Sequence, residues 1–304
     1  MIDYTYSRYL SAKMTVDDRA INKDVVERLR LELAEQETPE KRVLEIGAGL
    51  GTMVARLVDW SLIQHADYTL LDVDAELLAG ARHWLVDWAH RRGHEIQEQD
   101  HTLRIKGAHG LDWAVHFIQG ELRSFLNRTS RVASADLLIA NAFLDIVDVS
   151  SVLPELLAAL VPTGLYWFTI NFDGDTIFEP SHPCDLKLME VYHRSMDERV
   201  RFGAPAGDSK TGRHLFEQLR RAGASVLSAG SSDWVVFAEN GRYKADEAHF
   251  VHHIIYTIDQ ELKQHPQIAS DELEEWVSKR HAQVDRGELV YIAHQLDFCG
   301  RPGS

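Results

Sequence analysis

The sequence predicts an α/β protein built on a doubly wound, mostly parallel sheet. Three observations support this fold class: short apolar runs alternate with amphipathic segments from residue 43 onward, a glycine-rich turn follows the first run, and an acid ends the second. Such alternation is typical of a parallel sheet covered by helices on both faces. The expected strands are 43–47, 68–72, 113–119, 135–141, 164–171, 224–239 and 289–298, and the first expected helices are 51–60, 75–91 and 151–160.

The turn after the first strand carries glycine at positions 47, 49 and 51. Glycine allows the backbone to approach a ligand closely and to adopt a positive φ. The dinucleotide-binding fingerprint Gly-x-Gly-x-x-Gly requires glycine one position later, where this chain has Thr52. A nicotinamide-dependent oxidoreductase is therefore a less favoured alternative.

The pattern acid-x-Gly-x-Gly-x-Gly, which begins at Glu45, resembles the first motif of the class I S-adenosylmethionine-dependent methyltransferases of the small-molecule type. The next apolar run ends in Asp72, at the place where a carboxylate can accept both hydroxyl hydrogens of a ribose. Alternatively, Asp72 only starts the following helix, as aspartate often does. The resemblance implies a Rossmann-like sheet of seven strands, in which the last strand inserts antiparallel beside the fifth.

Two further segments extend the resemblance. Residues 116–122 resemble the third strand and the loop in which Glu121 accepts the adenine amino group and the backbone of Leu122 meets the ring, although the family more often has aspartate there. Residues 136–145 resemble the fourth strand, whose end places Asn141 beside the methyl donor. The resemblance thus implies a site for S-adenosylmethionine made of Glu45, Gly47, Ala48, Gly49, Gly51, Asp72, Val73, Glu121, Leu122, Asn141 and Ala142.

The charge balance bears on the partners. The chain has 32 Lys and Arg against 47 Asp and Glu, a net charge of −15, which would repel a phosphate backbone or an anionic membrane. Asn141 is followed by Ala-Phe-Leu, whereas many enzymes that methylate exocyclic amines of bases or glutamine have Pro-Pro-aromatic. We therefore expect a small neutral or cationic acceptor, methylated on oxygen or nitrogen, and neither nucleic acid nor membrane as a partner.

Cysteine use and hydropathy bear on the compartment. Cys184 and Cys299 are the only cysteines, too few for a disulfide framework, and neither has further ligands at the usual metal spacing. No signal-like run begins the sequence, and no window approaches the roughly 18 apolar residues that span a bilayer. We expect a cytoplasmic protein without a bound metal. The oligomeric state stays open.

The domain organisation follows from periodicity. Residues 1–40 are expected to form a helical lid over the cofactor or, equally, a helix packed outside the sheet, and residues 41–304 the methyltransferase domain. Residues 172–210 hold three of the eight prolines and leave the carboxyl edge of the sheet, so they are expected to cap the substrate. Residues 243–286 are expected to form a helical insertion of unassigned role.

The chemistry implied is an in-line methyl transfer, for which the protein mainly aligns donor and acceptor in a dry pocket. A base that removes the acceptor's proton helps further, and the candidates are Asp145, Asp173 and His193. The expected substrate contacts are Tyr9, Phe143 and Asn171. Each of these residues has an ordinary structural alternative. The competing function is a cofactor-binding protein without transferase activity, either a sensor or an inactive partner.

Overall fold

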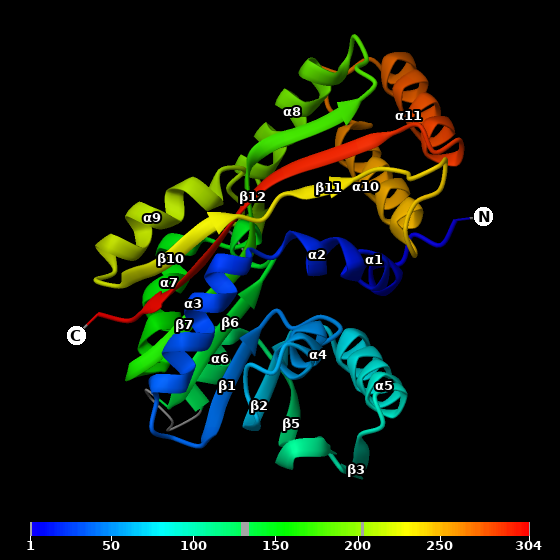
Figure 1. The fold of residues 1–304 in the computed structure, drawn as a ribbon. Helices are drawn as coiled ribbons and strands as arrows, with labels where there is room; N and C mark the ends of the chain where they lie inside the picture. The colour runs from blue at the N-terminus through cyan, green and yellow to red at the C-terminus, as the bar shows by residue number, and fades with distance from the viewer. Residues whose placement is uncertain (1, 129–133, 202–203, 304) are drawn as a thin grey trace.

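The computed structural model describes residues 2–128, 134–201 and 204–303. A large sheet with strand order β10-β12-β7-β6-β1-β2-β5-β4-β3 forms its centre (Figure 1). The strands of this sheet are β1 Glu40–Ile46, β2 His65–Asp72, β3 Glu95–Gln99, β4 Thr102–Lys106, β5 Asp112–Gln119, β6 Ala135–Asn141, β7 Leu160–Glu179, β10 Ser225–Ser231, β11 Trp234–Val236 and β12 Val290–Arg301.

Helices cover both faces of this sheet. They are α1 Tyr6–Ala12, α2 Met14–Ala20, α3 Lys23–Glu35, α4 Thr52–Asp59, α5 Ala75–Arg91, α6 Leu122–Arg128, α7 Val149–Ala158, α8 Asp185–Asp197, α9 Thr211–Arg221, α10 Glu247–Leu262 and α11 Ser270–Asp285. Short elements complete the chain: the 3₁₀ turns η1 Ala108–Gly110 and η2 Leu144–Ile146, and the small hairpin of β8 Val200–Arg201 and β9 Ala204–Pro205.

The predicted seven-stranded arrangement is confirmed. Strands β5, β2, β1, β6 and β7 are parallel, and β12 lies antiparallel between β7 and β10. The sequence 101–118 also predicts a hairpin, which β4 and β5 form, so β4 adds to the seven strands as expected. The sheet is larger than predicted, because β3 extends it beyond β4 and β11 pairs with β12. Strand β3 has the sequence Glu-Ile-Gln-Glu-Gln and lies at an exposed edge, so it lacks the apolar pattern by which a strand is recognised.

Two apolar cores lie on the two faces of the sheet. In β6, Leu137 and Ile139 pack with α3, α4 and α5, whereas Leu138 and Ala140 pack with α7 and α9. Because successive side chains of a strand point to opposite faces, a run that is apolar throughout is expected for a strand buried on both sides. This double burial fixes the order of β1, β6 and β7 at the centre of the molecule.

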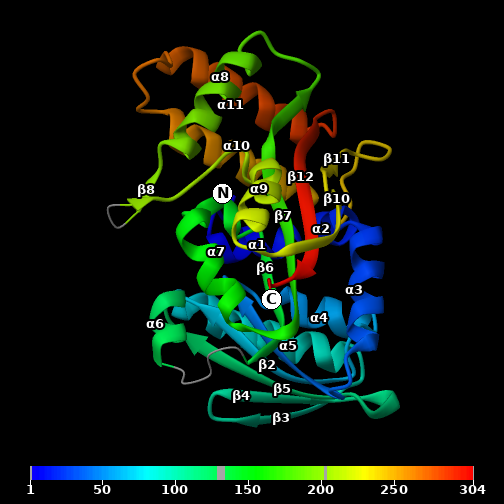
Figure 2. The same cartoon turned by 90° about the vertical axis from the view of Figure 1, so that its left-hand side faces the viewer.

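Strands β7 and β12 continue beyond the sheet as a ribbon, which β11 joins. We call this ribbon, with α8, α10 and α11 packed on it, the arm (Figures 1 and 2). Buried Arg280 ties α11 to α8, because its guanidinium donates to both oxygens of Asp185, at 2.6 and 2.5 Å, and to the carbonyl of Pro180. The two insertions predicted at 172–210 and 243–286 therefore form one structure, although 172–179 is a strand rather than an irregular cap.

The ribbon leaves the sheet at a strained residue. Ile170 has φ of +58°, a conformation that is costly for a β-branched side chain. Its amide donates to Asp297 on β12 at 2.7 Å, and Asp297 also accepts from the amide of Asn22 at 2.8 Å. Burial raises the pKa of Asp297 to about 6. One buried carboxyl thus holds the bend of β7 and the start of α3 together.

The N-terminal helices divide into two parts. Helix α3 packs against β10, β12 and β7, so it belongs to the layer that covers the sheet. Helices α1 and α2 instead lie between the arm and the glycine-rich turn (Figures 1 and 2). Asp17 on α2 accepts from the indole of Trp234 at 2.9 Å and from Lys13 at 2.7 Å. Of residues 1–40, α3 thus matches the alternative of a helix packed outside the sheet, and for α1 and α2 the lid stays a prediction. None of the helices in the described part of the chain is long and apolar enough to span a bilayer.

Candidate active site

The glycine-rich turn has the shape that the sequence predicted. Gly47, Gly49 and Gly51 have φ of +62°, +53° and +68°, which other residues adopt only with strain. The amide of Gly51 donates to the carbonyl of Ala48, and the amide of Ala48 donates to Leu71 on the neighbouring strand. Helix α4 begins directly after this turn. The loop is thus folded tightly against the carboxyl end of β2.

Asp72 connects this turn to the next one. Its carboxylate accepts from the amide of Gly49 at 2.8 Å and from the amide of Asp74 at 3.0 Å. Asp74, and not Asp72, caps helix α5, because it accepts from the amides of Glu76 and Leu77. The alternative that Asp72 only starts the helix is therefore wrong, because Asp72 binds the glycine turn and Asp74 caps the helix. Each of its oxygens keeps a second lone pair, so two acceptor positions remain for a ligand.

The other predicted cofactor residues lie at the same edge. The amide of Gly120 donates to the carbonyl of Asp72 at 2.9 Å, which brings Glu121 and Leu122 next to β2. Glu121 is exposed, as is Val73. At the end of β6, Asn141 accepts from the hydroxyl of Thr169 at 2.8 Å, and Ala142 has a strained φ of +51°. Strained backbone of this kind clusters at functional sites.

Glu45 differs from its prediction. Its side chain is buried on the face of the sheet that also holds Tyr68, whose hydroxyl donates to it at 2.7 Å. Burial raises the pKa of Glu45 to about 8, and the hydrogen bond from Tyr68 and the charge of Arg56 only partly oppose this. The carboxyl is enclosed by protein and not presented to a ligand. Direct contact between Glu45 and the cofactor is therefore not supported.

Two side chains of the protein pack closely against the glycine turn. A Cβ atom on Gly47 would lie 2.4 Å from the ring of Phe143, and one on Gly49 would lie 3.1 Å from Leu10. Phe143 follows β6 and Leu10 lies on α1, so both come from segments far away in sequence. The absence of side chains at these glycines makes room for Phe143 and Leu10 in this structure.

Asp145, the first predicted base, lies in η2 just after β6. One of its carboxylate oxygens is buried and has no hydrogen-bond partner in the described ranges of the chain. Burial raises its pKa to about 6, although a hydrogen bond from its own backbone and the charges of Lys13 and Arg199 lower it. A buried carboxylate oxygen without a partner is costly, so it calls for an explanation.

Three tyrosines surround the same region. Tyr9 on α1, Tyr192 on α8 and Tyr291 on β12 all have a pKa raised by burial, to about 12 for Tyr192. The charge of Asp145 further raises the pKa of Tyr192, and Tyr192 raises the pKa of Tyr9 and that of Tyr291. Their hydroxyls make no hydrogen bond to any residue that the structure describes. Tyr9 also stacks on His253, with ring centroids 4.5 Å apart.

The two other predicted bases have structural partners. Asp173 is buried, accepts from the backbone and side chain of Arg213 at 2.7 and 2.8 Å, and lies 3.4 Å from His294. His193 is half-buried and bonds the hydroxyl of Thr176 at 3.0 Å, and burial lowers its pKa. Ion pairing engages Asp173 and a hydrogen bond to β7 engages His193, so their roles as bases stay predictions and Asp145 is the candidate with an unpaired oxygen.

Asn171 is likewise placed differently from its prediction as a substrate contact. It is fully buried and donates to the carbonyl of Leu296 at 2.8 Å, within the pairing of β7 and β12. Of the predicted substrate contacts, Tyr9 and Phe143 lie near the site. The sequence analysis missed Lys13, Tyr192, Arg199 and Tyr291 as site residues. No local motif marks them, and only the aromatic content of the N-terminus and of the cap gave a signal.

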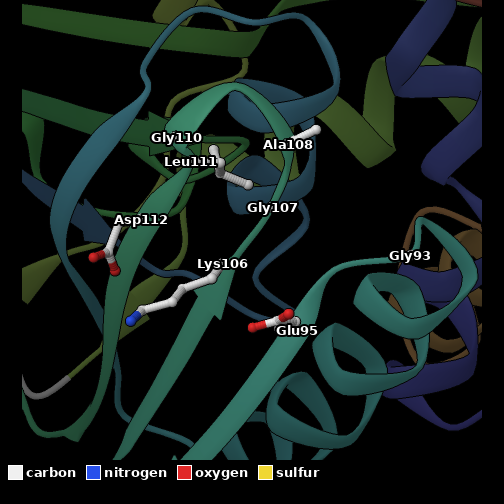
Figure 3. Close-up of a pocket in the computed structure, with 8 residues that line it drawn as sticks. All are labelled: Gly93, Glu95, Lys106, Gly107, Ala108, Gly110, Leu111 and Asp112. Atoms are coloured by element: carbon white, nitrogen blue, oxygen red, sulfur yellow. The ribbon is translucent and has the colours of Figure 1, made fainter.

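The hollows on the surface lie elsewhere. Figure 3 shows one of about 470 Å³ at the amino end of β5, opposite to the edge that carries the glycine turn, where Lys106 lies across from both Glu95 and Asp112. Another of about 410 Å³ lies between α2, α4 and α5. Neither is lined by the glycine turn or by Asp145, so neither is the candidate site.

Comparison with known proteins shows the fold. No family model matches the chain, and no curated protein matches it in sequence. Among solved structures, a candidate methyltransferase from Bacillus halodurans C-125 is 11% identical and superposes with a TM-score of 0.51 over 93% of this chain and 100% of its own. The YcgJ protein from Bacillus subtilis is 14% identical, with a TM-score of 0.47 over 92% and 100% of the two chains. With the strand order described above, the first of these similarities shows that the chain has the class I S-adenosylmethionine-dependent methyltransferase fold.

Proposed function

We propose that the protein binds S-adenosylmethionine at the carboxyl ends of β1, β2, β5 and β6 and transfers its methyl group to oxygen or nitrogen of a small-molecule acceptor. The observation that carries the proposal is the buried, unpartnered oxygen of Asp145 directly after β6. Together with the glycine turn and Asp72, this oxygen supports a base near the edge of the sheet at which ligands bind in such folds.

The residues at this edge fit the cofactor. The glycine turn offers close backbone approach, Asp72 keeps two acceptor positions for ribose hydroxyls, and Glu121 with Leu122 lies next to it for the adenine. The cofactor, when bound, supplies an electrophilic methyl group on a sulfonium. Asn141 and Ala142 lie at the end of β6, between this edge and Asp145.

Asp145 is suited to remove a proton from the acceptor. Because its pKa is about 6, the carboxyl is mostly ionised at pH 7 and yet more basic than an ordinary aspartate. A base with a pKa close to the working pH contributes a factor on the order of 10² to 10⁴ to the rate. Helix α1 covers the glycine turn through Leu10, and we assign it the role of a lid that excludes water.

The acidic balance of the chain supports a small acceptor in place of a nucleic acid. With a net charge of −15, a phosphate backbone gains little from the protein's general field. Tyrosines contributed by α1, α8 and β12, all with a pKa raised by burial, would suit a small acceptor better than a nucleic acid.

One observation favours a second candidate, a cofactor-binding protein without transferase activity. The ring of Phe143 lies against Gly47 and Leu10 lies against Gly49, so side chains occupy space next to the turn. If this packing persists with the ligand bound, the acceptor side would be closed. A sensor that responds to the cofactor, or an inactive partner in a complex, would follow.

Titration calorimetry tests the cofactor assignment. We expect binding of S-adenosylmethionine and of S-adenosylhomocysteine, and weaker or no binding of NAD. Tighter binding of NAD than of either sulfur compound would overturn the assignment. Transfer of a labelled methyl group to metabolites of a cell extract, followed by mass spectrometry, then separates the two candidates. A protein that binds the donor and labels no small molecule is the sensor or inactive partner.

A further inference from the structure

The hollow of about 410 Å³ between α2, α4 and α5 has the size and the lining of a ligand site (Figure 1). Ligand pockets typically measure about 300–1,000 Å³ and are lined mainly by apolar and aromatic side chains. Three of the chain's seven tryptophans line this hollow: Trp60 at the end of α4, and Trp84 and Trp88 on α5. Trp60 has a ring contact with Trp167 and Trp88 has one with His94, but within the described chain no two of the three contact each other. The space between their rings is therefore not filled by the rings themselves, and we call it the tryptophan hollow.

The charged side chains of the tryptophan hollow are paired, with one exception. Arg56 donates to Asp18 at 2.7 Å, and Arg92 donates to Asp59 at 2.7 Å. Arg91, the third arginine of the lining, makes no side-chain hydrogen bond or ion pair with any residue that the structure describes. The lining thus has three arginines against two aspartates, an excess of one positive charge in a chain whose net charge is −15.

Indole N–H groups add hydrogen-bond donors to the hollow. The indole of Trp88 donates to Asp59 at 3.4 Å, whereas those of Trp60 and Trp84 make no hydrogen bond within residues 2–128, 134–201 and 204–303. Trp84 and Arg91 are seven residues apart on α5, about two helical turns, so they lie on the same face of this helix. An indole and a guanidinium both donate hydrogen bonds and accept none. The unpaired side chains of the hollow therefore suit an anionic ligand.

We propose that the tryptophan hollow binds a planar aromatic compound that carries one carboxylate. The aromatic part packs among the three tryptophans, because aromatic rings in offset or edge-to-face contact attract each other beyond the effect of the area they bury. The carboxylate accepts from Arg91, whose guanidinium matches its two oxygens, and from the indole N–H of Trp84. A single negative charge balances the single unpaired arginine, so cations and polyanions fit this site less well.

This site is separate from the edge that carries the glycine turn, and it does not depend on the proposed methyl transfer. Its walls include Asp18 on α2 and Arg56 on α4, the helix that begins directly after Gly51. Arg56 already links the two helices, because it donates to Asp18 and, at 2.9 Å, to the hydroxyl of Thr52. A ligand in the hollow touches α2 and α4 together, so it adds to this link and holds α2 against α4.

Matched probes test the ligand class. We would measure the binding of naphthylacetate by calorimetry and compare it with neutral naphthylacetamide, cationic naphthylethylamine and non-aromatic cyclohexylacetate. We expect naphthylacetate to bind about fivefold more tightly than the amide, the upper end for an ion pair exposed to solvent, and more tightly than the other two compounds. Equal affinity of the acid and the amide, tighter binding of the amine or of cyclohexylacetate, or no binding of any probe would overturn the proposal.

Variants of the lining test where the acid binds. Arg91→Gln should remove the difference in affinity between naphthylacetate and its amide, and Trp84→Leu should weaken both by about tenfold through the loss of an aromatic face. The control is Arg82→Gln on the same helix, because Arg82 pairs with Glu98 and does not line the hollow, so every affinity should stay unchanged.

Arg91 is exposed, so Arg91→Gln should fold like the parent and decides the question even if Trp84→Leu does not fold. An unchanged preference of Arg91→Gln for the acid over the amide would contradict the assignment. Displacement of naphthylacetate by S-adenosylhomocysteine would contradict it as well, because the acid would then lie at the cofactor edge and not in the tryptophan hollow.

Discussion

The two halves of the candidate site are built in opposite ways. In the cofactor half, the polar groups are satisfied within short stretches of chain: Asp72 bonds Gly49 and Asp74, and Gly120 bonds Asp72. In the acceptor half, the candidate side chains come from distant segments, and one oxygen of Asp145 stays unpaired among the described residues.

This difference is informative about function. The cofactor is the same in every turnover, so preformed backbone geometry can hold it. The side chains that bind the acceptor and react with it must instead keep hydrogen-bonding capacity that no other protein group uses. Unpaired buried groups cost stability, so they persist only where the rest of the fold compensates for them. We therefore expect substitutions in the acceptor half to change turnover and those in the cofactor half to change affinity.

The largest effect is expected for Asp145→Asn. The amide keeps the shape of the side chain but cannot take a proton, so turnover should fall by roughly 10²- to 10⁴-fold. Affinity for S-adenosylhomocysteine should stay the same in calorimetry. The control is Asp175→Asn, an exposed aspartate of the arm. Unchanged turnover in Asp145→Asn would remove this residue from the mechanism.

The pH dependence of kcat/KM should report the same group. Because Asp145 acts in its ionised form and its pKa is about 6, the rate should rise about tenfold per pH unit below pH 6 and level off above it. Rate measurements between pH 4.5 and 8 reveal this limb. The assignment is wrong if Asp145→Asn retains residual activity with the same rising limb.

Asp72→Ala should weaken cofactor binding by roughly 1.5–3 kcal/mol, about 10- to 150-fold, because it removes an ionised hydrogen-bond acceptor. Asp74→Ala is the matched control. It removes the cap of α5 and should lower stability by about 1 kcal/mol while leaving cofactor affinity nearly unchanged. Equal losses of affinity in both variants would show that Asp72 acts only through the fold of the loop.

Removal of residues 1–12 tests the lid. It deletes α1 with Tyr9 and Leu10 but keeps Lys13 and its ion pair with Asp17. The circular dichroism spectrum should stay that of a folded sheet, and turnover should fall by roughly 10- to 100-fold because donor and acceptor are less well enclosed. Full activity and full cofactor affinity in this variant would show that α1 only packs against the sheet and the arm and is not a lid.

Glu45→Gln concerns stability and not activity. Burial raises the pKa of Glu45 from its ordinary value of 4.5 to about 8, so the folded protein holds this proton more tightly than the unfolded chain does. The stabilising contribution is complete below about pH 4.5 and is lost as the pH rises through 8. Glutamine still accepts the bond from Tyr68 and does not titrate. In urea unfolding, the variant should therefore lose less stability than the parent between pH 5 and 8.5, and exposed Glu190→Gln should behave like the parent.

The sequence alone determined the sheet and the cofactor half of the site. Strand β6 and helix α5 have the predicted bounds, and the glycine turn and the acid that ends β2 lie where the motif placed them. These features are readable because each depends on residues close in sequence: double burial gives a continuous apolar run, and a positive φ requires glycine. The exception is Glu45, whose side chain turns into the core because neighbouring side chains of a strand point to opposite faces.

Only the tertiary structure decided the acceptor half. It couples Tyr9 from α1, Tyr192 from the cap and Tyr291 from the last strand electrostatically, although up to 282 residues separate them, from position 9 to position 291. The tertiary structure also pairs Asp173 with Arg213 and buries Asn171 between β7 and β12. No local sequence pattern reveals either contact. Whether a polar side chain is free to act depends on which distant groups lie within about 3 Å of it, and that is a property of packing and not of sequence spacing.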